Sequence, residues 1–74
     1  MRVHVTLKGT LAGNLPGGQG EVEVADGATV GTLSDSLGLP GGPCVFVVNG
    51  TAAKRDEPLS DGDRVQAFPP MAGG

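Results

Sequence analysis

The sequence has few of the residues that carry metal and redox chemistry. Among 74 residues there is one cysteine, one histidine and neither tryptophan nor tyrosine. The single cysteine, Cys44, excludes an internal disulfide. Together with His4 it cannot supply the roughly four ligands of a zinc site. We therefore expect no metal and no bound cofactor. The chain also offers no acid/base pair and no nucleophile with a matching base, so we do not expect an enzyme in its own right.

Positive charge and long apolar runs are also scarce. Five Lys and Arg against eight Asp and Glu give a formal net charge of -3, whereas a general nucleic-acid binder needs a basic surface. No apolar run approaches the roughly 18 to 20 residues of a membrane-spanning helix, and the alternating residues 1–6 do not resemble a signal peptide. We expect a soluble, cytoplasmic protein that partners neither nucleic acid nor a membrane.

What is present is a set of short apolar runs separated by 14 glycines and 6 prolines. Residues 3–7 and residues 22–24 alternate between Val or Leu and polar side chains, which predicts two half-buried strands. The intervening segment, residues 9–20, is rich in glycine, and we expect a long hairpin loop without a helix there. The chain length allows one small domain.

A short helix is predicted after the second strand. Thr29 can cap its first turn through the side-chain hydroxyl. Val30, Leu33 and Leu37 follow at a spacing that places them on one face of a helix, and Gly38 suits the left-handed position that ends it. Because several of the other residues are poor helix formers, we expect this helix to be stable only when packed on a sheet.

The remainder predicts three more strands. Residues 44–48 are continuously apolar, as in a central strand, and Asn49-Gly50 predicts a type I′ hairpin turn into a short edge at residues 51–53. A turn at residues 61–63 leads into the last strand. The order is compatible with an α+β, ubiquitin-like β-grasp fold, a mixed sheet of four to five strands crossed by one short helix. The helix is expected to pack on the strand valines: Val3, Val5, Val22, Val24, Val45, Val47 and Val65.

The C-terminal segment is the most informative part of the chain. Two prolines, Pro69 and Pro70, end sheet pairing because they lack an N–H donor, and Gly73-Gly74 gives a thin end that fits a narrow enzyme slot. We therefore divide the chain into a domain at residues 1–68 and a flexible diglycine tail at residues 69–74. Phe68 is either an exposed docking anchor or a residue packed against the neighbouring strand edge or against Pro43.

Three stretches resemble a known family. They are Val48-Asn49-Gly50, Leu59-Ser60-Asp61-Gly62-Asp63-Arg64-Val65, and Phe68-Pro69-Pro70-Met71-Ala72-Gly73-Gly74. Together they resemble the ubiquitin-like sulfur carriers of the MoaD/ThiS type. The double proline is closer to the small subunit of molybdopterin synthase than to the thiamine carrier. The glycine-rich segment after the first strand departs from this pattern, because molybdopterin-type carriers usually have a helical segment there.

The resemblance implies a carrier and not a catalyst. An E1-like adenylyltransferase of the MoeB/ThiF type would use ATP to adenylate the carboxylate of Gly74, next to Gly73, and sulfur would replace AMP to give a thiocarboxylate. The sulfur would then pass to a large synthase subunit or another sulfur-accepting enzyme, most simply in molybdopterin biosynthesis. The residues expected to contact these partners are Phe68, Pro69, Pro70, Met71 and Ala72.

Two other functions remain compatible with the sequence, besides a carrier for the thiamine thiazole or another sulfur metabolite. A ubiquitin-like modifier, joined to lysines of other proteins through Gly74, needs the same activated tail. A plain β-grasp interaction module would not use the tail at all. These alternatives differ in whether the terminal carboxylate has to be free.

Overall fold

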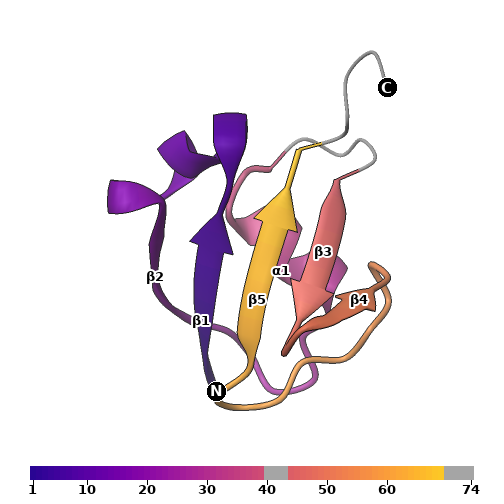
Figure 1. The fold of residues 1–74 in the computed structure, drawn as a ribbon. Helices are drawn as coiled ribbons and strands as arrows, with labels where there is room; N and C mark the ends of the chain where they lie inside the picture. The colour runs from indigo at the N-terminus through magenta and orange to yellow at the C-terminus, as the bar shows by residue number, and fades with distance from the viewer. Residues whose placement is uncertain (40–43, 70–74) are drawn as a thin grey trace.

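The computed structural model describes residues 1–39 and 44–69, which form a five-stranded sheet with an α-helix packed across one face (Figure 1). The strand order is β2-β1-β5-β3-β4. The elements, in chain order, are β1 (Arg2–Leu7), the 3-10 helices η1 (Gly9–Asn14) and η2 (Pro16–Gly18), β2 (Gln19–Glu23), α1 (Val30–Ser36), β3 (Val45–Val48), β4 (Thr51–Ala53) and β5 (Arg64–Phe68).

The first and last strands of the chain lie side by side at the centre of the sheet. β1 and β5 are parallel, with Val5 opposite Val65 and Leu7 opposite Ala67. The pairs β1–β2, β3–β4 and β3–β5 are antiparallel. A parallel pair needs a crossover connection, and the chain from β2 through α1 to β3 supplies part of it. The predicted β-grasp, a mixed sheet crossed by one short helix, is confirmed.

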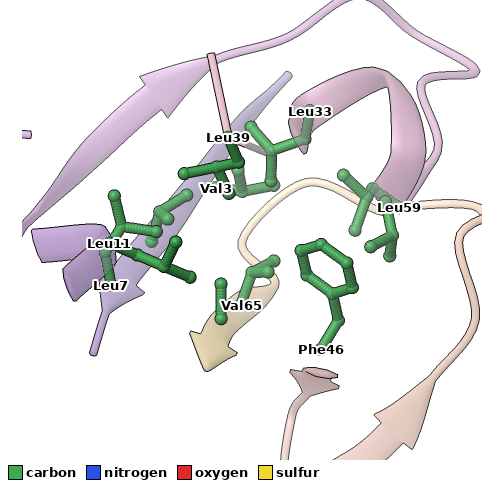
Figure 2. Close-up of a cluster of buried hydrophobic side chains, with 11 residues drawn as sticks. Val3, Leu7, Leu11, Leu33, Leu39, Phe46, Leu59 and Val65 are labelled. Atoms are coloured by element: carbon green, nitrogen blue, oxygen red, sulfur yellow. The ribbon is translucent and has the colours of Figure 1, made fainter. Parts of the chain in front are cut away.

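The core lies between the sheet and α1. Val3, Val5 and Val65 are each 1% exposed and Val30 is fully buried, so the predicted alternation of the first and last strands is correct. Figure 2 shows the larger members of this cluster meeting between the two layers. Val22, Val24 and Leu37 were expected to be core residues as well, but they are half-buried at its margin.

The prediction that Val45 and Val47 face the core is wrong. Phe46 is 4% exposed and faces inward, whereas Val45 is 48% exposed. The antiparallel register explains this orientation, because Phe46 lies opposite the buried Ala67 and directly opposed residues share one face of a sheet. A continuous apolar run contains no alternation, so the sequence of β3 alone does not identify the inward face.

Both ends of α1 are capped as expected. The hydroxyl of Thr29 accepts a hydrogen bond from the Thr32 N–H at 3.2 Å. At the other end Gly38 has a φ of 71°. The Gly38 N–H donates to the Asp35 carbonyl at 3.1 Å and the Leu39 N–H donates to the Ser34 carbonyl at 3.1 Å, which is a Schellman motif. None of the helices in the described part of the chain is long and apolar enough to cross a membrane.

The expected loop at residues 9–20 is instead two 3-10 helices followed by the start of β2. Leu11 is 3% exposed and fixes η1 to the core. The Asn14 amide group donates to the carbonyls of Leu37 and Gly38 at 3.0 and 3.3 Å, which ties this segment to the end of α1. Glycine disfavours a long α-helix, but a 3-10 turn needs only isolated i to i+3 hydrogen bonds. A glycine-rich segment can therefore form 3-10 turns, so its composition alone does not predict an irregular loop.

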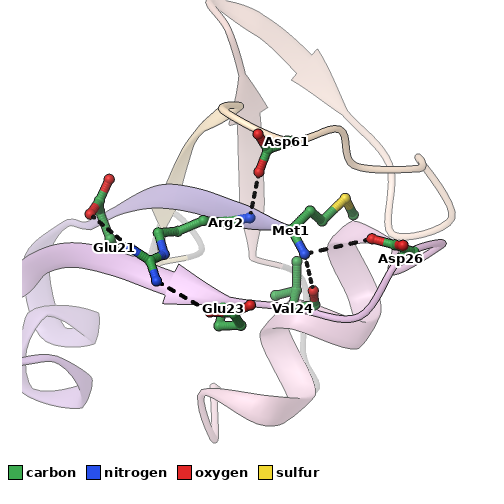
Figure 3. A network of polar contacts seen from close by, with 7 residues as sticks. All are labelled: Met1, Arg2, Glu21, Glu23, Val24, Asp26 and Asp61. Atoms are coloured by element: carbon green, nitrogen blue, oxygen red, sulfur yellow. Dashed lines mark hydrogen bonds and ion pairs between the residues drawn. The ribbon is translucent and has the colours of Figure 1, made fainter.

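Polar contacts hold the end of the sheet opposite the tail (Figure 3). The Asp61 carboxylate accepts from the backbone N–H of Arg2 at 2.8 Å. The Arg2 guanidinium lies 3.4 Å from the Glu23 carboxylate. The Met1 amino group donates to the Val24 carbonyl at 2.8 Å and lies 3.6 Å from the carboxylate of Asp26.

The predicted hairpin turn is confirmed, with φ of 51° at Asn49 and 83° at Gly50. Asn49 also joins this turn to the one before β5. Its side-chain amide donates to Asp63 Oδ1 at 2.9 Å, and its side-chain oxygen accepts from the Arg64 N–H at 2.9 Å. The side chain of Asn49 therefore links the hairpin turn at Asn49-Gly50 to the turn that precedes β5.

Ser34 gives a test of the core. Its side chain is 1% exposed, and its hydroxyl has no hydrogen-bond partner among the described residues. An unpaired buried hydroxyl is costly, and alanine is the better helix former. We expect Ser34→Ala to raise the free energy of unfolding by about 1 kcal/mol, measured by urea denaturation.

The matched control is Ser36→Ala, because the Ser36 hydroxyl donates to the Leu33 carbonyl at 2.9 Å. Removing this partnered, exposed hydroxyl should change stability by less than about 0.5 kcal/mol. A lower stability of Ser34→Ala than of the unmodified protein would contradict the description of the core.

Candidate functional site: the tail exit and the adjacent sheet face

The candidate site is the end of the sheet at which β5 finishes at Phe68, followed by Pro69. β1 and β5 run in the same direction and end together, next to η1 (Figure 1). Beyond the paired strands, the Lys8 N–H donates to the Ala67 carbonyl at 2.9 Å. This hydrogen bond fixes the end of β5 to the end of β1, so the position of Phe68 and Pro69 is set by the central strands.

Phe68 lies on the outer face of the sheet, the face opposite α1. Inward and outward residues alternate along β5, where Val65 and Ala67 are buried and Gln66 is exposed. Phe68 is half-buried, and the register places it directly opposite Val45 on β3. Side chains at this spacing contact each other across the strands. Phe68 therefore lies beside Val45 of the neighbouring strand and remains partly exposed, while the alternative contact with Pro43 lies outside the described residues.

An apolar group occupies this end of the outer face. Val45, Val47 and Phe68 alternate with inward residues on neighbouring strands, and we call them the outer-face patch. Val45 is the one large hydrophobic residue among the described residues that is classed as exposed, at 48%. Exposed apolar side chains gathered on one face are typical of protein–protein contact sites.

Charged side chains occupy the opposite end of the outer face. The guanidinium of Arg2 lies 3.9 Å from the carboxylate of Glu21 and 3.4 Å from that of Glu23. His4 and Arg64 are opposite each other in the β1–β5 register. The outer face is thus apolar where the tail begins and charged where the chain starts.

The structure places only part of the predicted site. Phe68 and Pro69 lie together at the end of β5. The other predicted site residues, which are Pro70, Met71, Ala72, Gly73 and Gly74, lie outside the described residues. Sequence reasoning missed Val45, which joins the site because β3 faces the other way. The sequence held no signal for this, because the apolar run of β3 has no alternation and only the register against β5 shows which of its residues face inward.

The described residues offer no group of three His, Cys, Asp or Glu side chains that could hold a metal ion. Cys44, which precedes β3, is half-buried and forms no disulfide. The described part of the candidate site thus consists of a firmly held strand end and an apolar surface beside it.

Comparison with protein families matches residues 10–74 to the ThiS family. A curated relative is the molybdopterin synthase sulfur carrier subunit of Escherichia coli (strain K12), with 46% identity over 39 residues. That alignment covers 53% of this chain and 48% of the relative, so it spans about half the length of each protein.

Solved structures extend the likeness to the whole fold. SAMP1 from Haloferax volcanii, a small archaeal modifier protein, superimposes with a TM-score of 0.79 and 27% identity, covering 100% of both chains. The putative molybdopterin converting factor subunit 1 from Pyrococcus furiosus gives a TM-score of 0.71 and 27% identity, covering 95% of this chain and 98% of that one.

These findings confirm the resemblance drawn from the C-terminal motifs. The family model covers most of the chain, including the final strand and the diglycine end. The fold neighbours share the β-grasp along their full length. The chain therefore belongs to the ThiS family.

Proposed function

We propose that the protein carries sulfur as a thiocarboxylate on Gly74, for the synthesis of the molybdenum cofactor in the cytoplasm. The observation that carries this proposal is the fixed end of β5, where the Lys8 N–H binds the Ala67 carbonyl and Pro69 follows beside an exposed apolar patch. From that point the sequence runs through Pro70, Met71 and Ala72 to Gly73-Gly74. Residues 69–74 are the tail that a partner enzyme receives.

The proposed reaction starts from the C-terminal carboxylate of Gly74, which is a poor electrophile. A C-terminal carboxyl has a pKa near 3.5 and is an anion at neutral pH. In the proposed reaction a carboxylate oxygen of Gly74 attacks the α-phosphorus of ATP and pyrophosphate leaves. A sulfide equivalent then attacks the acyl carbon, and AMP leaves with the C–O bonding electrons, which gives the thiocarboxylate. The partner supplies the catalytic groups, because this chain has no nucleophile and base of its own.

Two kinds of partner follow from this scheme. An E1-like adenylyltransferase of the MoeB/ThiF type would bind ATP and activate the tail. A large synthase subunit would accept the sulfur, and the relatives named as a sulfur carrier subunit and as subunit 1 support such an assembly. We assign the outer-face patch to contact with these enzymes, since it borders the start of the tail and a docked body would aim Gly74 at their active sites.

The molybdopterin pathway is favoured over the thiazole pathway by the two relatives named for it and by the double proline. A second function is supported by the likeness to SAMP1, a modifier protein, which covers the whole of both chains. In that function the activated Gly74 forms an amide with a lysine of another protein. Both functions use the same first step, so one chain can serve both.

Removal of Gly74 tests the proposal directly. We incubate the protein with a MoeB/ThiF-type enzyme, ATP and a sulfur source and measure its intact mass. The unmodified protein should gain the mass difference between sulfur and oxygen, whereas the variant lacking Gly74 should not change. Thermal unfolding serves as the control: the core residues and the sheet all lie before Pro69, so both proteins should melt at the same temperature. An equal mass gain in the shortened protein would contradict the proposal.

The docking surface is tested by Val45→Ser. Because the Val45 side chain is about half exposed, its replacement changes the outer-face patch more than the core. We expect binding to the activating enzyme to weaken about tenfold, as for an anchor residue of an interface, measured by isothermal titration calorimetry. Glu21→Gln, on the same face at the far edge of the sheet, should leave the affinity within about twofold. Equal affinities for both variants would place the interface elsewhere.

A further inference from the structure

The turn that follows β1 touches the start of the tail. Gly9 follows Lys8, whose N–H holds the end of β5. A Cβ built on Gly9 would lie 3.1 Å from Cγ and 3.4 Å from Cδ of Pro69. The Pro69 ring therefore packs against the bare backbone of Gly9, and a side chain there would meet it at less than the ordinary van der Waals separation.

Gly9 meets a second requirement at the same position. Its φ is 57°, in the left-handed region that glycine adopts without steric cost. Gly17 in η2 has a similar φ of 68°, but a Cβ at Gly17 would have no atom within 4 Å. The two glycines thus share the conformational requirement, and only Gly9 has a neighbour from the tail.

We propose that Gly9 is a positioning residue: it sets the direction in which the chain leaves the domain at Pro69, and so the place to which Gly74 is delivered. This inference rests on the proposed function. The Pro69 ring fixes its own φ, so a displaced ring turns the chain that follows. Five residues follow Pro69 up to Gly74, and the direction in which they start is set where the Pro69 ring meets Gly9.

Small displacements of a reacting group matter for catalysis. A misplacement of about 1 Å can slow a reaction by up to about 100-fold, because the reacting atoms lose their alignment. A contact at Gly9 acts on the delivery of the carboxylate and leaves the outer-face patch unchanged. It should therefore affect kcat of adenylation and spare KM for the carrier.

The test compares Gly9→Asn with Gly17→Asn. Asparagine tolerates a positive φ, as Asn49 does in this protein at 51°. Both variants should fold, and only the first places a side chain against Pro69. We expect Gly9→Asn to lower kcat of ATP-dependent adenylation at least tenfold, with KM within about twofold, and Gly17→Asn to match the unmodified protein.

Pro69→Ala should rescue the Gly9→Asn variant, because it removes the Cγ and Cδ atoms that the asparagine side chain would meet. In the Pro69→Ala background, Gly9→Asn should change kcat by less than about threefold, so that the two substitutions are strongly coupled. The inference is overturned if Gly9→Asn retains the unmodified kcat, or if its effect is the same with and without the proline ring.

A second measurement needs no activating enzyme. A nitroxide attached at Thr51→Cys, with Cys44→Ala in every variant, broadens the amide signals of Gly73 and Gly74 according to their distance from the label. Gly9→Asn should change this broadening and Gly17→Asn should not. If the unmodified protein is never adenylated, the proposed function fails, but the broadening measurement still tests the role of Gly9. Unchanged broadening at Gly73 and Gly74 in the Gly9→Asn variant would overturn the inference.

Discussion

The parallel pairing of β1 with β5 is the constraint on which the rest of the structure depends. It joins residues from the two ends of the chain, with Val5 opposite Val65 and Leu7 opposite Ala67. These side chains are among the most buried in the protein, so the strand that leads to the tail is also a central strand of the core. Because β5 cannot shift without opening the core, the starting point of the tail is as firmly placed as the fold itself.

In this arrangement the folded domain and the proposed reacting group lie in different parts of the chain. The inner face of the sheet and α1 make the core, while the outer face presents Val45, Val47 and Phe68 beside the tail exit. No described residue group is arranged to bind a metal ion. In our proposal the body is recognised by a partner and the carboxylate of Gly74 is the reacting group, so specificity and reactivity reside in different parts of a very small chain.

The sequence predicted the features that depend on local backbone chemistry. The capping hydroxyl of Thr29, the left-handed Gly38 and the Asn49-Gly50 turn each come from a short list of residues favoured at such positions, so each could be predicted from the sequence alone. The orientation of Val45 was predicted wrongly, because the inward face of a fully apolar strand is set by its neighbour. The 3-10 helices were missed since their stability comes from Leu11 in the core and from Asn14 at the end of α1. The importance of Gly9 could not be predicted for a similar reason, because Pro69, which it contacts, is distant along the chain.

ATP–pyrophosphate exchange tests the central claim most directly. A MoeB/ThiF-type enzyme exchanges labelled pyrophosphate into ATP only while a carrier carboxylate is being adenylated. We predict exchange with the protein as it stands, and none with a version extended by one alanine after Gly74, because the extension removes the glycine carboxylate and leaves the folded body intact. Equal exchange with both proteins would contradict the claim that the reactive group is the carboxylate of Gly74.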